Sequence, residues 1–326
     1  MTVVVQKYGG TSVGDPSRIK AVADRVVRTR DLGNDLIVVV SAMGATTDSL
    51  LDLAAEVSSS PHPREMDMLL TAGERISMAL LAMALHDRGV PAVSFTGSQA
   101  GILTDSSHGG ARITRITGER VLEALHQGKV VIVAGFQGVD PASKEVTTLG
   151  RGGSDTTAVA LAATVEAAAC EILTDVAGVF TADPRVVPDA RLIPEIAYDQ
   201  MISLAHAGAG VLMAHSVETA REHRVPVHVR SSFTDEEGSW VRPESAALPF
   251  AGLAHKIESD RGLVTVVGTD APSAGDEHVG ALRDSGIDAT LSGTDEGSAT
   301  YSMPSEQTGD AMRFLHTRLF QLEASK

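Results

Sequence analysis

The stretch Thr148-Leu149-Gly150-Arg151-Gly152-Gly153-Ser154-Asp155-Thr156-Thr157 places a glycine-rich loop directly before an alanine-rich helical pattern. A second glycine stretch, Lys7-Tyr8-Gly9-Gly10-Thr11-Ser12, follows a run of three valines. Both stretches leave bare backbone N–H groups at a strand end or a helix start, where the helix dipole also favours negative charge. Together they predict a site that holds a polyphosphate and a small anionic partner.

The charged residues of the two loops suggest how such a site would work. Lys7, at the end of a strand, can neutralise charge on a phosphoryl group in transfer. Arg151 offers a planar fork that suits a carboxylate or a phosphate. Asp155 can orient Lys7 or a magnesium ion, and Ser154 is a candidate helix N-cap. Each loop is by itself also compatible with an ordinary glycine turn that carries exposed charges.

Strands and helices alternate regularly through the first 230 residues. Apolar runs predict strands at 2–6, 35–40, 91–95, 129–134, 171–173 and 225–229. Helical spacing predicts helices at 16–27, 46–57, 64–88, 120–127, 154–168, 199–205 and 216–223, with an interruption or kink in the long one near Gly73. This alternation is typical of βαβ units, and it predicts an α/β fold with a mostly parallel sheet between helices.

Composition limits the function classes. The chain has 326 residues, is 43% hydrophobic but only 3% aromatic, and carries a net charge of −15. An acidic surface argues against nucleic-acid binding, which needs a basic face. A single cysteine, Cys170, excludes an intramolecular disulfide and a cysteine-based metal cluster. Without a signal-peptide pattern or an apolar run of about 20 residues, we expect a cytoplasmic protein that is not inserted in a membrane.

A second, smaller domain is expected after a polar segment. Residues 233–249 are rich in Glu, Ser and Pro and are typical of a linker. Beyond them the pattern predicts strands at 262–267, 289–291 and 298–303, with helices at 278–284 and 309–320. This βαββα order predicts a small α+β domain over residues 250–326.

Weaker motifs lie between these elements. Glu74 is a carboxylate that can bind an ammonium group, although a mid-helix Glu–Arg pair usually lies on a solvated face. Ser41 and Thr47 flank a glycine and can donate hydroxyl hydrogen bonds or simply cap a helix. Thr174-Asp175 ends a strand, and the turn Asp183-Pro184-Arg185 follows it. No P-loop, dinucleotide fingerprint, nucleophile elbow or zinc-protease motif occurs in the sequence.

Taken together, the motifs resemble those of the aspartokinases, within the amino acid kinase family. The matching segments occur in the family's order over residues 1–232. They are Val4–Ser12, Val39–Gly44, Leu70–Ser77, Phe95–Gly101, Val133–Gly138, Thr147–Ala160 and Thr174–Arg185. The resemblance implies an amino-acid-kinase αβα sandwich and an ATP- and Mg²⁺-dependent phosphotransferase that phosphorylates the side-chain carboxylate of L-aspartate.

The resemblance also implies roles for individual residues, and no protein-held metal ion. Lys7 would stabilise the phosphoryl group, and Asp155 would hold Lys7 in place. Ser41 would contact phosphate. The substrate-binding residues would be Ser41, Thr47, Glu74 and Arg151. Glu74 would bind the amino group of aspartate, and Arg151 a carboxylate. The nucleotide would contact Lys7, Gly9, Gly10, Thr174, Asp175, Phe180 and Arg185.

The sequence departs from the family pattern in three places. Gly210 stands where a nucleotide-contacting lysine is usual, and His215 where an arginine is usual. Ala177 and Phe180 replace an aspartate and a tyrosine. Only one ACT-like unit follows where the family usually has two in tandem, so we expect weak or no inhibition by lysine or threonine.

These departures leave more than one function open. The resemblance implies a catalytic domain over 1–232, a linker over 233–249, and a single ACT-like domain over 250–326 through which the chain would form a homodimer. One alternative is a catalytically weak or inactive homologue that serves as a ligand-binding or partner subunit. Another is a kinase for a different small amino acid, because Glu74 with Arg151 selects an α-amino acid but not its side chain.

Overall fold

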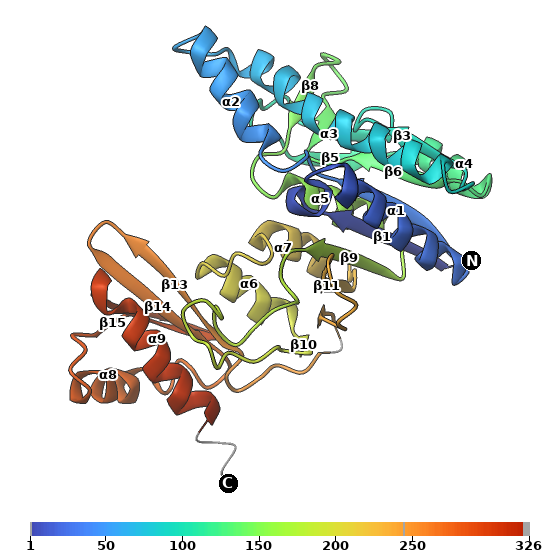
Figure 1. Ribbon diagram of the computed structural model, residues 1–326. Coiled ribbons are helices and arrows are strands. Elements are labelled where there is room, and N and C mark those ends of the chain that lie inside the picture. Colours follow the sequence, from blue (N-terminus) through green and yellow to red (C-terminus); the bar gives the residue numbers. More distant parts are fainter. Residues whose placement is uncertain (1, 244, 322–326) are drawn as a thin grey trace. The chain divides into compact units, whose positions relative to one another are not determined.

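The computed structural model describes residues 2–243 and 245–321, which fall into two compact units (Figure 1). The first unit comprises the residues up to 176 together with 222–236. The second comprises 177–221 and the residues from 237 onward. The expected boundaries at 232 and 249 therefore remain a prediction, and the last five residues of the expected 250–326 domain lie outside the described residues.

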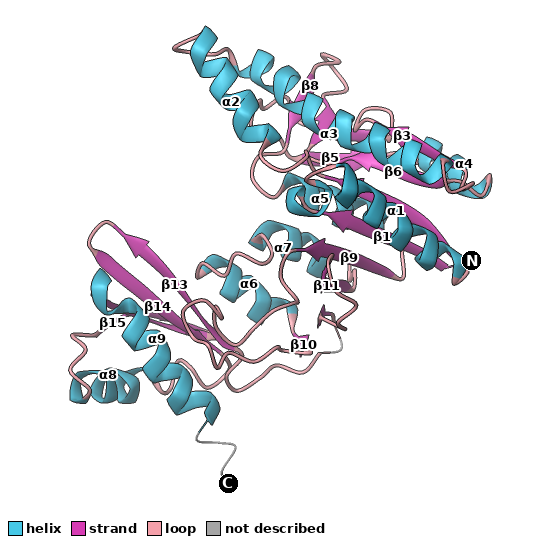
Figure 2. Cartoon of the chain, viewed as in Figure 1, coloured by secondary structure: helices cyan, strands magenta, loops and turns pink. Residues whose placement is uncertain are grey.

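A parallel sheet forms the centre of the first unit (Figure 2). Its strands are β1 (Thr2–Tyr8), β2 (Asn34–Val40), β3 (Ala92–Phe95), β6 (Val130–Ala134), β9 (Ala169–Thr174) and β11 (Val227–Ser231). Their order across the sheet is β11-β9-β1-β2-β6-β3, and every neighbouring pair is parallel. Valine-rich runs suit this position because a parallel sheet is buried on both faces.

Helices cover both faces of this sheet. Alternate residues of β2, namely Leu36, Val38 and Val40, pack in one core with helices α1 (Pro16–Asp31) and α3 (Pro63–His86). Helix α5 (Gly153–Thr164) packs against β1, β2 and β9 on the opposite face, and α4 (Glu119–His126) packs against β6. The predicted αβα sandwich with a mostly parallel sheet is confirmed.

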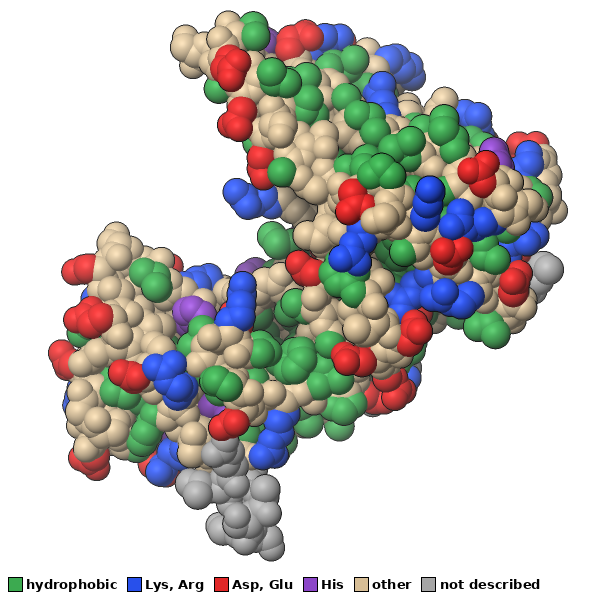
Figure 3. Space-filling view, in the orientation of Figure 1, with side chains coloured by type: hydrophobic (Ala, Val, Ile, Leu, Met, Phe, Trp, Pro, Cys, Tyr) green, Lys and Arg blue, Asp and Glu red, His purple; other side chains and the backbone are tan. Residues whose placement is uncertain are grey.

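Helix α3 is continuous, so the interruption expected near Gly73 does not occur. Gly73 is needed for packing instead, because a Cβ there would lie 2.7 Å from the Cβ of Ala42. By length and composition alone α3 could cross a membrane, but its inner face is buried in the core. The outer face of α3 and helix α2 (Thr46–Val57) both expose apolar side chains. These side chains gather over the two helices in Figure 3, where they are green.

The first unit also contains a small second sheet that the sequence did not predict. It consists of β4 (Ile102–Thr104), β5 (Ile113–Ile116), β7 (Gln137–Val139) and β8 (Val146–Thr148), in the order β5-β4-β7-β8. Strands of three or four residues show too little periodicity to be recognised in a sequence. Strand β8 leads directly into the glycine loop before α5.

The second unit carries an antiparallel sheet in the order β13-β14-β16-β15. Its elements are β13 (Gly252–Glu258), β14 (Arg261–Val267), α8 (Gly275–Asp284), β15 (Thr290–Asp295), β16 (Ser298–Pro304) and α9 (Thr308–His316). Both helices share one core with the sheet. This ACT-like arrangement is confirmed, but the expected βαββα order omitted β13. The second half of that strand is polar and exposed, and its pairing with β14 defines it.

The remaining elements of the second unit lie in the segment 177–241. They are β10 (Glu195–Ile196), α6 (Tyr198–His206), α7 (Ala214–Glu222) and β12 (Ser239–Val241). Strands β10 and β12 pair in parallel. Strand β12 lies within residues 233–249, so the segment expected to be a linker contains regular structure.

We expect Gly73→Ala to lower the melting temperature of the protein. Overpacking against Ala42 typically costs about 1–3 kcal/mol, which exceeds the gain of about 1 kcal/mol in helix propensity. Gly280→Ala, in α8, is the matched control, because no atom lies within 4 Å of the added Cβ. That control should leave the melting temperature unchanged or raise it. Equal behaviour of the two variants in thermal unfolding would contradict the packing role of Gly73.

Candidate active site

Lys7 lies at the carboxyl end of β1 and forms an ion pair with Asp155. The Lys7 Nζ is 2.6 Å from the Asp155 Oδ1, and each side chain is only 11% exposed. Asp155 belongs to the first turn of α5, so its charge also interacts favourably with the helix dipole. Of the two partners considered for Asp155, Lys7 is the one that it contacts. The ion pair restricts Lys7 to one orientation at the sheet edge.

Backbone hydrogen bonds connect the loops that follow β1, β2 and β9. The Gly9 N–H donates to the carbonyl of Leu173, and the Ser41 N–H donates to that of Tyr8, both at 3.1 Å. The Gly44 N–H donates to the Gly10 carbonyl at 3.0 Å. A Cβ at Gly10 would lie 3.0 Å from a carbonyl oxygen of the next loop, so a glycine permits this close approach.

Glu74 projects from α3 to the same group of loops. Its Oε1 accepts a hydrogen bond from the Ala42 N–H at 3.1 Å, and the whole residue is only 4% exposed. Its Oε2 is buried and has no hydrogen-bond partner in the part of the chain that the structure describes. Burial raises the pKa of this carboxyl to about 7. The unpartnered oxygen is therefore suited to a cationic ligand.

Arg151 lies at the tip of the glycine loop. Its neighbours Gly150 and Gly152 have φ angles of 72° and 73°, a conformation that favours glycine. Arg151 is exposed, and within the described ranges no ion pair holds it. Helix α5 begins at Gly153 with Gly152 as its N-cap, so the expectation that Ser154 caps it is wrong. Ser154 lies inside the first turn, where a side chain at Gly135 would collide with it.

The other expected site residues are distributed over both units. Thr174 ends β9 and donates a hydrogen bond to Asp175, and a Cβ at Gly9 would lie 4.0 Å from the Thr174 Oγ1. Thr47 is half-buried in the first turn of α2. Phe180 and Arg185 belong to the second unit, where Arg185 forms a 2.7 Å ion pair with Asp183. Their assignment to the nucleotide pocket remains a prediction.

The profile of the amino acid kinase family matches residues 2–231 of the chain. This chain belongs to the amino acid kinase family. Within the family it groups with the aspartokinases. It is 56% identical over 273 residues to the aspartokinase of Mycolicibacterium smegmatis, a match that covers 82% of this chain and 64% of the relative. It is 48% identical over 328 residues to the aspartokinase of Corynebacterium glutamicum, a match that covers 97% of this chain and 77% of the relative. The chain thus spans 64% and 77% of the length of these two relatives.

Solved aspartokinase structures share the fold. Aspartokinase III of E. coli in complex with aspartate and ADP superimposes with a TM-score of 0.86 at 24% identity, covering 98% of this chain and 100% of that one. Aspartate kinase from Synechocystis superimposes with a TM-score of 0.67 at 40% identity, covering 95% and 54%. These likenesses confirm the amino-acid-kinase sandwich and the ACT-like sheet.

Several residues that shape this candidate site were not identified from the sequence. Phe136 has a positive φ of 70°, and its N–H donates to the Thr157 Oγ1 at 3.1 Å. Ala42 supplies the N–H that holds Glu74. Asp67 is fully buried one helical heptad before Glu74. Of these residues, only Asp67 could have been identified from the sequence pattern, because a carboxylate seven residues from Glu74 lies on the same face of an apolar helix.

The described residues contain no group of three or more His, Cys, Asp or Glu side chains that could hold a metal ion. A magnesium ion that accompanies ATP usually keeps several waters and binds mainly to the phosphates. A magnesium ion that arrives with a nucleotide at this site remains a prediction.

We expect Glu74→Gln to stabilise the ligand-free protein above pH 7. Burial raises the pKa of the Glu74 carboxyl from 4.5 to about 7. The protein therefore loses stability as pH rises through this interval, because the folded state disfavours the ionised carboxylate. The variant should gain up to about 3 kcal/mol at pH 8 and little at pH 4. Glu56→Gln, at an exposed position of α2, is the control and should show no such trend. Denaturant unfolding of both variants across pH measures the difference, and a pH-independent difference for Glu74→Gln would contradict the burial argument.

Proposed function

We propose that this chain transfers the γ-phosphoryl group of MgATP to the side-chain carboxylate of L-aspartate, giving 4-phospho-L-aspartate. The observation that carries this proposal is the buried, unpartnered Glu74 Oε2 in the same group of loops as the Lys7–Asp155 ion pair. Its relatives support the proposal, since aspartokinase III of E. coli was solved with aspartate and ADP.

The chemistry requires little from the protein beyond positioning and charge. An aspartate side chain is ionised at pH 7, so one of its oxygens can attack the γ-phosphorus without a general base. A new P–O bond forms to the carboxylate while the bond to the β-phosphate oxygen breaks, and ADP leaves. Lys7 would stabilise the negative charge on the transferring group. Asp155 would keep Lys7 aimed at that position.

The recognition of aspartate would use charges of both signs. Aspartate carries one ammonium and two carboxylates. The Glu74 Oε2 would accept a hydrogen bond from the ammonium, and the free guanidinium of Arg151 would pair with a carboxylate. Ser41 and Thr47 would donate hydroxyl hydrogen bonds. This pattern accounts for an α-amino acid, and the choice of aspartate among amino acids is supported by the relatives.

The nucleotide would lie across the glycine ends of β1 and β9. Phosphate oxygens can approach the backbone at Gly9 and Gly10 closely because no side chain intervenes. The Gly10 N–H would donate to them, since the Gly9 N–H already donates to the Leu173 carbonyl. Thr174, Asp175, Phe180 and Arg185 would contact the rest of ATP, and Phe180 keeps an aromatic stacking face. When bound, Mg²⁺ would neutralise charge on the phosphates.

A second candidate function rests on the Gly210–His215 segment. By the family pattern, Gly210 stands where a nucleotide-contacting lysine is usual, and His215 stands where an arginine is usual. This favours weaker use of ATP, and at its limit a homologue that binds aspartate as a partner subunit. A kinase for another small amino acid is the remaining alternative.

We also propose that the chain is a cytoplasmic homodimer that assembles through its ACT-like sheet. All residues of the edge strand β15 are exposed, so its backbone groups are available for pairing with a second copy. The functional division would be a catalytic domain over 1–232, a linker over 233–249 and the ACT-like domain over 250–326.

The test of the function is an assay with MgATP, L-aspartate and hydroxylamine, which traps an acyl phosphate as aspartyl hydroxamate. The wild-type protein should form hydroxamate, and Lys7→Ala should lower kcat by about 10²–10⁴-fold with little change in the KM for aspartate. Lys129→Ala, at a surface position before β6, is the matched control. Absence of hydroxamate with wild-type protein that still binds ATP would refute the kinase proposal.

We expect Gly210→Lys to lower the KM for ATP by about tenfold, the gain typical of one hydrogen bond to a charged group. No atom lies within 4 Å of a Cβ at Gly210, so the site can accommodate the side chain. Gly280→Lys, equally open in α8, is the control for added surface charge. An unchanged KM for ATP in the hydroxamate assay would show that this position does not contact the nucleotide.

A further inference from the structure

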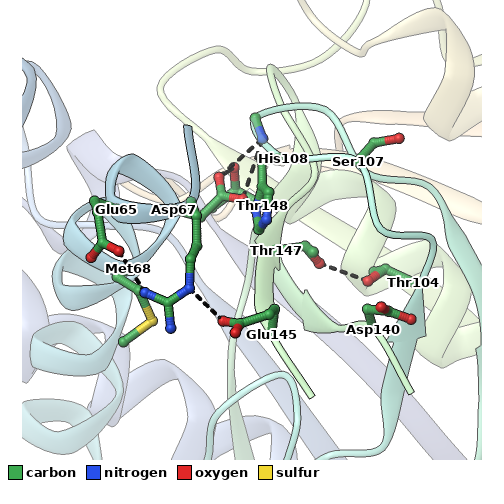
Figure 4. A network of polar contacts seen from close by, with 12 residues as sticks. Glu65, Asp67, Met68, Thr104, Ser107, His108, Asp140, Glu145, Thr147 and Thr148 are labelled. Carbon is green, nitrogen blue, oxygen red and sulfur yellow. Dashed lines mark hydrogen bonds and ion pairs between the residues drawn. The ribbon is translucent and has the colours of Figure 1, made fainter. Parts of the chain in front are cut away.

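A buried carboxylate outside the expected site connects Glu74 and Arg151, two of the residues proposed to bind aspartate. Asp67, in α3, has no exposed surface. Its Oδ2 accepts from the His108 Nδ1 at 2.6 Å, and its Oδ1 accepts from the Thr148 Oγ1 at 2.5 Å and the Gly109 N–H at 3.0 Å (Figure 4). A carboxylate removed from water requires such a complete set of donors.

The first connection leads to Glu74. Asp67 precedes Glu74 by seven residues in one continuous helix, so both side chains leave the same face of α3 about two turns apart. Any displacement of this part of the helix therefore moves Glu74 as well. Asp67 and Glu74 are the two buried carboxylates of α3.

The second connection leads to Arg151. Thr148 is the last residue of β8, three positions before Arg151. The Thr148 carbonyl accepts from the Ala111 N–H at 2.8 Å, and a Cβ at Gly150 would lie 3.3 Å from the Gly109 carbonyl oxygen. The loop that contains His108 and Gly109 thus lies directly against the glycine loop that carries Arg151.

The glycine loop depends on external contacts for its order. Arg151 lies between two glycines of positive φ, and such residues lose more conformational entropy on ordering than others. The nearby ion pair between Arg64 and Glu145 also joins α3 to the residue that precedes β8, but it is partly exposed and contributes little. The hydrogen bonds to Asp67 share a fully buried, charged acceptor, which makes them the stronger link.

We propose that Asp67 and His108 form a positioning pair that holds Glu74 and Arg151 at the separation that aspartate requires. This inference rests on the proposed function. Neither residue contacts the substrate in this scheme. A pre-ordered site binds its ligand more tightly because less entropy is lost on binding. The affinity for aspartate then depends on the pair, whereas the affinity for ATP, which contacts the ends of β1 and β9, does not.

The test compares His108→Ala with wild-type protein in the hydroxamate assay. The His108 side chain is 22% exposed, so its truncation leaves a smaller defect than truncation of Asp67 would. We expect the KM for aspartate to rise about five- to thirtyfold, with kcat and the KM for ATP within about twofold of wild type. His108→Asn restores an N–H donor and should recover most of the affinity. His126→Ala, at an exposed position of α4, is the matched control.

A second variant and a hydrogen-exchange measurement separate the outcomes. Thr148→Val removes a different donor to Asp67 and should also raise the KM for aspartate. Hydrogen exchange of the 149–153 amides should become faster in both variants without any ligand. An unchanged KM for aspartate in active His108→Ala, or equal rises in both KM values, would overturn the role of the pair. Inactive wild-type protein would instead overturn the proposed function.

Discussion

Parallel strands end at the same edge of a sheet, and the proposed site depends on this constraint. Lys7 is the penultimate residue of one strand, Ser41 follows its neighbour, and Thr174 ends the strand on the other side. Ligands of open α/β sheets bind at this edge, where loops are free to carry function. Backbone hydrogen bonds of 3.0–3.1 Å join these loops directly, so a change in one loop affects the others. The glycines permit the close approach.

Two helices supply the charges that these loops lack. Helix α5 contributes Asp155, which neutralises and orients Lys7. Helix α3 contributes Glu74, whose second oxygen is buried without a partner among the described residues. An unpaired buried carboxyl costs stability in the free protein. A cationic ligand would relieve that cost on binding, so the site would favour cationic ligands over neutral ones.

Much of the fold could be predicted, because long elements have strong periodic patterns. The helix expected at 46–57 has those bounds, and the strand expected at 35–40 begins only one residue earlier. The short strands β4, β5, β7 and β8 and the polar β13 were missed, since pairing with neighbours rather than local pattern defines them. The kink expected at Gly73 was wrong because the glycine serves contact with another segment, not a break in the helix.

The sequence by itself determined the parallel αβα sandwich, the glycine loops, and the identity of Lys7 and Arg151 as candidate site residues. Only the tertiary structure decided that Asp155 contacts Lys7 and that burial raises the pKa of Glu74. It alone also brought Asp67 to His108 and Thr148, which are 41 and 81 residues away in the chain. Periodicity records which face of an element is apolar. It does not record which distant segment packs there, and burial, pKa and long-range hydrogen bonds follow from that packing.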